Sequence, residues 1–272
     1  MTWRAGCNAV MASALLACLT AEAASELPWQ VEAGLGTDQL SNGAPDWSQV
    51  DVSLRRRFEQ RSIVELGLRR TRRSGLVDEE IGASVGLPLG AQWSTTLTAA
   101  VSPSHQVLAR AGGRIDLARS FDDGWVASAA LGRRLYTDAG NSLVAVGVER
   151  YVGDWRLAAA VGQNRLDGGD TAANTRLQFD HSFAAERGRV GLILARGREL
   201  ESVPATAQAP ADVIYQRVST VALVGTWALA AAWALTGEAS HVRIDDIQRR
   251  NGAPAGAPYN RNSVRVGVRH DF

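Results

Sequence analysis

The last eleven residues of this chain alternate strictly between apolar and polar or small side chains. Val264, Val266 and Val268 fall at every second position, and the chain stops on Phe272. Because successive side chains of a β-strand point to opposite faces, this pattern predicts a strand with one apolar face and one polar face. The three valines and Phe272 would share the apolar face, and Arg265 would lie on the other. Such a strand belongs to a sheet that meets an apolar environment on one side only.

Segments with the same alternation recur from Trp29 onward, and no long stretch shows the helical period of about 3.6 residues. They predict fourteen strands joined as a meander of hairpins. A count of about twelve is the alternative, because the alternation is weakest in 107–121 and 213–242. The expected strands span 29–37, 47–58, 61–71, 78–88, 91–101, 107–121, 125–136, 141–152, 155–164, 174–183, 188–197, 213–227, 230–242 and 259–272.

The segment 218–235 is nearly uniformly apolar and about as long as a transmembrane helix. Its first half contains β-branched residues such as Val221 and Val224, and Gly225 lies inside it, which favours strands over a helix. We therefore predict two strands and a tight turn here, with a helix as the alternative. The face that each side chain takes stays open.

The predicted connections alternate in length along the chain. Short turns are expected at 59–60, 89–90, 122–124, 153–154, 184–187 and 228–229, and longer loops at 39–46, 72–77, 102–106, 137–140, 165–173, 198–212 and 243–258. Short turns on one side and long loops on the other are typical of bacterial outer-membrane barrels, in which the short turns face the periplasm. The sequence thus predicts an all-β fold, an antiparallel up-and-down transmembrane β-barrel of about 14 strands.

The beginning of the chain has the pattern of a secretion signal. Arg4 supplies a positive charge, an apolar run follows, and 21–23 is a small-residue cleavage pattern. We expect a signal peptide at 1–23 and an outer-membrane barrel domain at 24–272. Lipoprotein processing at Cys18 is the alternative. In either case the sequence predicts export from the cytoplasm.

The polar face of the predicted strands carries arginines accompanied by acidic residues. One interpretation is a selectivity lining that favours anions through close-range electrostatic fields. The other is a ladder of internal ion pairs in a narrow or closed barrel. The candidate lumen-lining residues are Arg55, Arg69, Arg110, Arg114, Asp116, Glu149, Arg156, Arg176, Arg265 and Arg269.

Aromatic residues recur near the ends of the predicted strands, where amphipathic rings favour a membrane interface. Aromatic packing at strand ends also occurs in soluble β-sandwiches, so this feature does not decide between the two fold classes. The residues in question are Trp47, Trp93, Trp125, Trp155, Trp233, Tyr136, Tyr151 and Tyr259.

No enzymatic constellation stands out. His181 and Ser182 are adjacent, so in a strand their side chains would lie on opposite faces and would not cooperate. The acidic cluster 78–80 could attract Ca²⁺, but it lacks the spacing of a known calcium loop and is more simply explained as solvated charge. We therefore predict no enzyme, no metal and no cofactor. The formal net charge of +1 argues against nucleic-acid binding.

Three stretches carry a family resemblance: Glu149 to Leu157, the step Gly225-Thr226-Trp227, and the ending from Tyr259-Asn260-Arg261 to Phe272. They resemble the YaiO family of outer-membrane β-barrels, and the resemblance covers nearly all of the predicted mature chain. It implies an integral outer-membrane protein. For some members of the family it also implies an association with surface-polysaccharide systems.

Together these features predict an integral β-barrel in the outer membrane of a Gram-negative bacterium. Its expected role is a conduit or a structural component at the cell surface, linked to surface polysaccharide. The alternatives are an outer-membrane lipid-modifying enzyme and a non-conducting scaffold or adhesion barrel. The expected partners are outer-membrane lipid, lipopolysaccharide, polysaccharide and the barrel-assembly machinery, for which Val264, Val266, Val268 and Phe272 would form the assembly signal.

Overall fold

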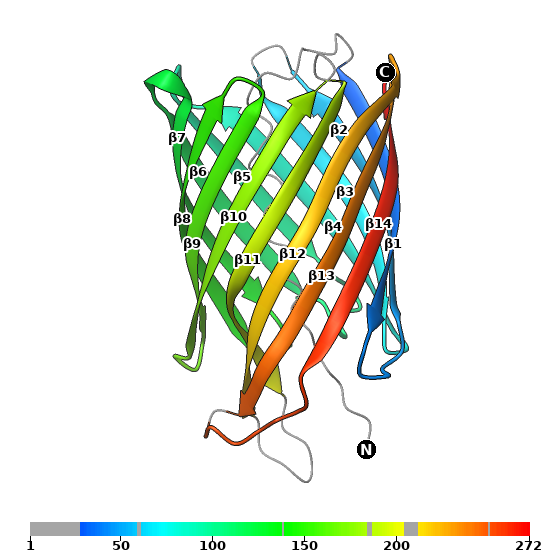
Figure 1. Ribbon diagram of the computed structural model, residues 1–272, viewed down its shortest axis with the longest axis vertical. Helices are drawn as coiled ribbons and strands as arrows, with labels where there is room; N and C mark the ends of the chain where they lie inside the picture. Colours follow the sequence, from blue (N-terminus) through cyan, green and yellow to red (C-terminus); the bar gives the residue numbers. More distant parts are fainter. Residues whose placement is uncertain (1–27, 59–60, 138, 184–186, 204–211, 250) are drawn as a thin grey trace.

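The computed structural model describes residues 28–58, 61–137, 139–183, 187–203, 212–249 and 251–272. These residues form a closed barrel in which every strand pairs antiparallel with its neighbours in sequence and β14 closes on β1 (Figure 1). The predicted up-and-down barrel of fourteen strands is confirmed. The predicted signal peptide lies outside the described residues.

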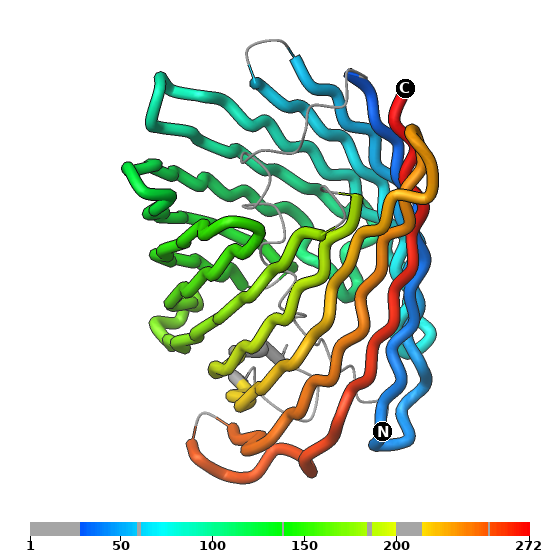
Figure 2. The backbone as a smooth tube through the Cα atoms, turned by 45° about the horizontal axis from the view of Figure 1, so that its top comes forward, coloured from blue at the N-terminus to red at the C-terminus, as the bar shows by residue number. Residues whose placement is uncertain are grey.

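The strands are β1 (Trp29–Leu40), β2 (Trp47–Arg57), β3 (Ile63–Arg73), β4 (Leu76–Pro88), β5 (Trp93–Val101), β6 (Ala111–Ser120), β7 (Trp125–Leu135), β8 (Gly140–Val152), β9 (Trp155–Leu166), β10 (Thr171–Phe183), β11 (Gly188–Val203), β12 (Asp212–Ala230), β13 (Trp233–Arg249) and β14 (Tyr259–Asp271). A single turn of 3-10 helix, η2 (Asp122–Gly124), joins β6 to β7. Figure 2 shows the strands running obliquely around the barrel, as closure of a sheet requires.

The two ends of the barrel differ as the connection lengths predict. Strands β2, β4, β6, β8, β10 and β12 end at the upper end in Figure 1, where the C-terminus also lies. The first and last strands meet at this end, where the Trp29 amide donates to the Phe272 carbonyl at 3.0 Å and the Phe272 amide donates back at 2.9 Å. We call this end the short-turn rim and the opposite end the long-loop rim.

Several predicted boundaries are wrong. The expected loop at 72–77 is a two-residue hairpin, Ser74-Gly75, because both residues adopt positive φ values, 49° and 83°. The strand expected from 107 begins only at Ala111. By contrast, β11 and β13 are longer than expected and extend well into the predicted loops 198–212 and 243–258.

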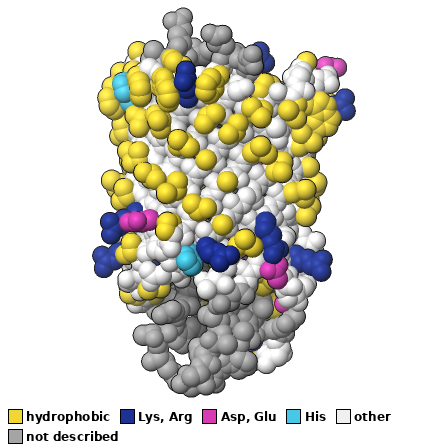
Figure 3. All heavy atoms as spheres, turned by 180° about the vertical axis from the view of Figure 1, so that it is seen from behind, with side chains coloured by type: hydrophobic (Ala, Val, Ile, Leu, Met, Phe, Trp, Pro, Cys, Tyr) yellow, Lys and Arg dark blue, Asp and Glu magenta, His cyan; other side chains and the backbone are white. Residues whose placement is uncertain are grey.

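The outer surface of the barrel is a broad apolar band (Figure 3). Every second residue of a strand contributes to it, as in β14, where Val264, Val266 and Val268 are 53%, 44% and 41% exposed. Large apolar side chains exposed in this number would be unfavourable in water, so the band marks the surface that faces lipid. The predicted facing of the three valines is confirmed.

The apolar segment in β12 and β13 is a hairpin of strands, as predicted, although its turn lies at 231–232. Leu223 and Trp227 are exposed on the lipid-facing surface, whereas Val218 and Ala222 are buried on the inner face. Both faces of β12 are therefore apolar, which is why the sequence does not alternate there. Among the described residues, no helix has the length and hydropathy needed to span a membrane.

Candidate functional site: the inner wall of the barrel

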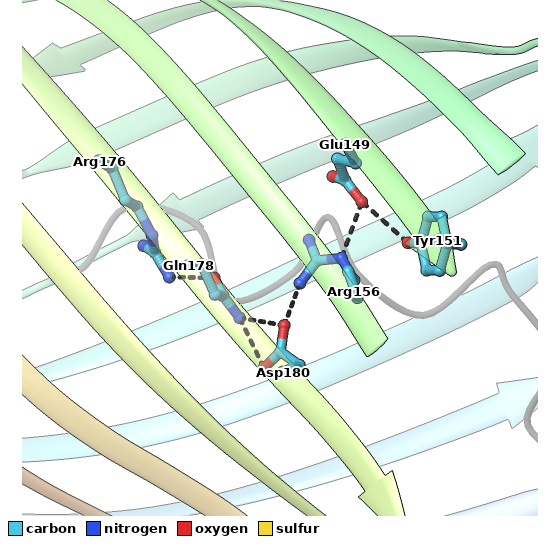
Figure 4. A network of polar contacts seen from close by, with 6 residues as sticks. All are labelled: Glu149, Tyr151, Arg156, Arg176, Gln178 and Asp180. Carbon is cyan, nitrogen blue, oxygen red and sulfur yellow. Dashed lines mark hydrogen bonds and ion pairs between the residues drawn. The ribbon is translucent and has the colours of Figure 1, made fainter. Parts of the chain in front are cut away.

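A well-buried group of charged residues on the inner wall is a triad centred on Arg156. The Arg156 Nε donates to Glu149 Oε2 at 2.8 Å, and its terminal nitrogen donates to Asp180 Oδ2 at 2.6 Å (Figure 4). The three residues lie on β9, β8 and β10, and the register places Arg156 directly opposite Asp180. Their side chains are only 10%, 8% and 3% exposed. Charges this well covered need partners, and each carboxylate supplies one.

Neutral groups complete this triad. The Tyr151 hydroxyl donates to Glu149 Oε2 at 2.8 Å, and Gln178 Nε2 donates to Asp180 Oδ2 at 2.9 Å. Arg176 in turn donates to the Gln178 amide oxygen at 2.8 Å (Figure 4). The network thus crosses three strands and ties them together through side chains as well as through the backbone ladder.

Ion pairs between neighbouring strands continue around β2, β3 and β4. Arg55 bonds to Glu65 at 2.7 Å, and Arg69 bonds to Glu80 at 2.6 Å. In both cases the two residues are direct cross-strand partners. Opposite charges in that position attract each other across the sheet, so they stabilise the register as well as the wall.

One ion pair spans a whole strand. Arg265 on β14 pairs with Asp51 on β2, although β1 lies between them. This is possible because Gly34 and Gly36 are the residues of β1 that face Asp51 and Arg265. A Cβ on Gly34 would lie 3.2 Å from an oxygen of the Asp51 carboxylate, so a side chain there would crowd the pair.

The remaining predicted candidates divide into two groups. Arg114 bonds within its own strand to Asp116, with contacts of 2.6 to 2.9 Å, and Arg269 lies 3.7 Å from Asp271. Arg110 does not join the wall, because it is an exposed loop residue before the start of β6. The structure therefore pairs most of the predicted arginines with carboxylates, as the ion-pair interpretation expects.

Several aromatic residues expected at the membrane interface lie inside the barrel instead. Tyr151 belongs to the Arg156 network. Trp47 is 3% exposed and lies between two guanidinium groups, with Arg73 Cζ 4.8 Å and Arg261 Cζ 5.4 Å from its ring. Tyr259 packs against the buried cluster that contains Trp47. These residues take the inward-facing positions of their strands, which closeness to a strand end does not reveal. By contrast, Trp93 lies on the lipid-facing surface as predicted.

A cavity of about 110 Å³ lies beside Trp47, on the side of the long-loop rim. Seven strands, β1 to β3 and β11 to β14, contribute to its lining. Hydroxyl groups are frequent there, including those of Thr71, Thr220 and Ser240. Within the described part of the chain, the buried Nε1 of Trp47 and Oγ1 of Thr71 have no hydrogen-bond partner. The cavity thus presents polar groups to the barrel interior.

Asp78 has a structural role that the sequence does not reveal. Its carboxylate is fully buried and accepts three backbone N–H groups, from Gln106 at 2.8 Å, Val107 at 2.6 Å and Leu108 at 2.7 Å. It therefore holds the loop between β5 and β6 against the end of β4. The interpretation of Asp78 as solvated loop charge is wrong.

The histidines are not arranged for acyl transfer. His181 stacks on Trp155 on the lipid-facing surface, with ring centroids 4.4 Å apart. His241 Nδ1 lies 2.7 Å from the Asn262 amide oxygen. Among the described residues, no group of three or more histidine, cysteine or acidic side chains is placed to hold a metal ion.

Comparisons with known proteins agree with this geometry. No protein-family model matches the chain, and neither does any curated protein sequence. Solved structures do match. The fold is that of outer-membrane β-barrels. The toluene transporter TodX of Pseudomonas putida matches with a TM-score of 0.56 and 8% identity, over 90% of each chain.

Two further solved structures match about equally well. The monoaromatic hydrocarbon channel CymD has a TM-score of 0.58 and 8% identity, over 90% of this chain and 89% of its own. A bacterial polysaccharide outer-membrane secretin has a TM-score of 0.58 and 8% identity, over 90% of this chain and 98% of its own. At such low identity the likeness shows the fold alone, so the substrate must be argued from the inner wall.

Proposed function

We propose that this protein is a passive conduit of the outer membrane for small, uncharged, hydroxyl-bearing solutes. The observation that carries the proposal is the inner wall of a closed barrel of fourteen strands, on which arginines and carboxylates are paired with each other. Barrels of about eight strands are filled by their own side chains, and wider ones leave room inside. A barrel of this size therefore has the dimensions of a channel.

The pairing of the wall determines what the conduit would select. A guanidinium bonded to a carboxylate at 2.6 or 2.7 Å presents almost no net charge at a distance of several ångströms. Such a wall should discriminate weakly between anions and cations. It still offers hydrogen bonds, and the hydroxyl groups around the cavity beside Trp47 add more. Solutes rich in hydroxyl groups fit this chemistry best, which supports the proposed link to saccharides.

The location and partners belong to the same proposal. A continuous apolar outer surface suits a bilayer, and short turns at one rim suit the periplasmic side of the outer membrane. We accordingly propose export through the signal at 1–23, contact with outer-membrane lipid and lipopolysaccharide, and insertion by the barrel-assembly machinery. Membership of the YaiO family and a link to surface polysaccharide stay predictions.

Liposome swelling tests the conduit directly. Liposomes that contain the purified barrel should swell in solutions of neutral sugars, at rates that fall with sugar size. Ser240→Trp, which places a large ring beside the cavity, should slow the swelling. Ala239→Trp is the matched control, because Ala239 is the preceding residue and faces lipid.

Current measurements in planar bilayers test the selectivity. In a salt gradient the reversal potential should lie near zero, since the wall favours neither ion. A strongly anion-selective current would instead support a lining of uncompensated arginines. No swelling and no current from a correctly folded barrel would contradict the proposal and favour a scaffold or adhesion role.

A further inference from the structure

A second set of arginines lies on the lipid-facing surface at the short-turn rim. Arg56, near the end of β2, lies between two aromatic rings, with its Cζ 4.8 Å from the Trp29 ring centroid and 4.7 Å from that of Phe58. Trp29 is the direct cross-strand partner of Arg56, and Phe58 lies two residues further on the same face. We call this arrangement a rim clamp.

The clamp recurs once with two rings and once with a single ring, and we call all three arrangements rim clamps. Arg119 lies 5.4 Å from the ring of Trp93 and 4.8 Å from that of Phe121, and Arg150 lies 5.1 Å from the ring of Trp125. In each case the tryptophan begins one strand and the arginine lies opposite it near the end of the next strand. Repetition at equivalent positions of separate hairpins indicates a common role at this rim.

Histidine occupies the same position in two other hairpins. His181 is the cross-strand partner of Trp155, and His270 is the partner of Trp233. Their rings stack on the tryptophans at 4.4 and 4.3 Å. Nitrogen-bearing planar side chains thus alternate with aromatic rings over much of the short-turn rim. Figure 3 shows an arginine and a histidine there, each surrounded by hydrophobic side chains.

The three clamp arginines lack the partners that the inner wall provides. Within the described part of the chain, no carboxylate forms an ion pair with Arg56, Arg119 or Arg150. One terminal nitrogen of Arg150 is buried and has no hydrogen-bond acceptor there either. A cation on a lipid-facing surface needs a compensating anion, and stacking on rings satisfies only the faces of the guanidinium.

The surroundings define the anion that fits. The flanking rings of Trp93 and Trp125 are 41% and 46% exposed, so the clamps are open towards the bilayer. They lie at the rim, where headgroups replace acyl chains, and the in-plane N–H groups of a stacked guanidinium match the oxygens of a phosphate. We propose that Arg56, Arg119 and Arg150 each bind the phosphate of a phospholipid, with the flanking rings against its glycerol and upper acyl region.

Native mass spectrometry of the full chain in detergent tests this proposal. After delipidation, titration with phosphatidylglycerol should leave three lipids bound at collision energies that remove all others, one for each clamp. The triple variant Arg56→Gln, Arg119→Gln, Arg150→Gln should lose all three. Each single variant should lose one, which keeps the test decisive if the triple variant does not fold.

The control removes arginines from the opposite rim. Arg70, Arg72 and Arg196 are exposed towards the long-loop rim, and their change to glutamine should leave the three bound lipids in place. Folding of every variant is checked by its heat-modifiable migration on gels. Equal lipid loss from the control variant, or no loss from the clamp variants, would overturn the proposal.

Two further probes identify the group that is recognised. A diacylglycerol with an uncharged sugar headgroup should not be retained, because it has the acyl chains without the phosphate. Inorganic phosphate should not displace the bound lipids, because it lacks the chains. Retention of the glycolipid would show that the rings alone hold the lipid, and displacement by inorganic phosphate would show a site for free anions. Either result contradicts the proposal.

Discussion

Arginine lies on both faces of this barrel, but its charge is compensated differently on each. On the inner wall Arg156 lies between Glu149 and Asp180, at 2.8 and 2.6 Å. At the short-turn rim Arg119 lies between Trp93 and Phe121, at 5.4 and 4.8 Å. The first arrangement supplies the counter-charge from within the chain. The second supplies only ring faces and leaves the counter-charge to the membrane.

The comparison gives the absence of lysine a physical meaning. All 29 basic residues of the chain are arginine. A guanidinium can bond to a carboxylate in its plane and stack on rings above and below, whereas an ammonium group is a strongly hydrated point charge without such a plane. One residue type therefore serves two surfaces that differ in polarity. Coding bias is the simpler origin of the composition, and the planar guanidinium makes that composition compatible with both surfaces.

The largest expected effect comes from breaking the inner triad. Arg156→Met would leave Glu149 and Asp180 without their cationic partner in a poorly solvated place, which should lower the free energy of unfolding by about 3–5 kcal/mol. Urea titration of the barrel in lipid vesicles, followed by tryptophan fluorescence, measures this quantity. Arg55→Met is the control, because its pair with Glu65 is 26% and 20% exposed and should contribute less than about 1 kcal/mol.

If both variants lost the same unfolding free energy, burial would not determine how much an inner ion pair contributes. The distinction between the Arg156 triad and the Arg55–Glu65 pair would then be wrong.

A second test concerns the pair that crosses β1. Gly34→Val should crowd the Asp51 carboxylate and weaken its bond to Arg265, at a cost of about 1–3 kcal/mol in unfolding free energy. Gly67→Val is the matched control, since a Cβ there would meet nothing closer than a backbone oxygen at 3.9 Å. The same urea titration distinguishes them. If Gly67→Val were as destabilised as Gly34→Val, the loss would come from replacing any inward-facing strand glycine by valine and not from weakening this ion pair.

A third test addresses the rim where β14 ends. Phe272 stacks on His270, with ring centroids 5.7 Å apart, and its backbone bonds to Trp29 close the barrel. Deletion of Phe272 should lower the yield of heat-modifiable barrel in cell membranes, because the last strand loses its aromatic end. The stability of the barrel that does form should fall by only about 0.5–1.5 kcal/mol. A normal yield without Phe272 would contradict its predicted role as an assembly signal.

The smallest effect is expected at a single clamp. Arg119→Lys keeps the charge but loses the stacked plane, so the unfolding free energy should fall by about 0.5–1 kcal/mol. Thermal unfolding in vesicles with and without phosphatidylglycerol measures it, and the difference between wild type and variant should grow when the phospholipid is present. If the difference between wild type and Arg119→Lys were the same with and without phosphatidylglycerol, the clamp would contribute only side-chain packing and would not bind the lipid.

Most of the fold can be predicted from the sequence, because every strand of a barrel in lipid follows the same local pattern of alternating apolar and polar residues. Wherever one face meets lipid and the other meets water, as in β14, alternation reveals both the strand and the orientation of each side chain. The pattern fails in β12, where Val218 and Ala222 make the inner face apolar as well. It also fails towards the end of β13, where charged residues such as Asp245 and Asp246 follow one another and therefore take both faces.

The sequence predicts which residues line the inner wall, but not which of them contact each other. The inward positions of Arg156 and Glu149 follow from the alternation. The place of Tyr151 near a strand end predicts the membrane interface, whereas its hydroxyl bonds to Glu149 inside the barrel. Parity tells which face a side chain takes, and only the register tells which residues meet across strands. The rim clamps have the same origin, since Trp93 and Arg119 lie far apart in sequence and meet as cross-strand partners.

By itself, then, the sequence determined the strands, their up-and-down order and the two faces, because these depend on the local period of two residues. Only the tertiary structure decided which charges are paired and which are not. A cross-strand contact depends on register and closure, as when β14 reaches β1 and brings Arg265 to Asp51 over the bare backbone of Gly34. Such contacts are set by the whole sheet and are not encoded in any single segment.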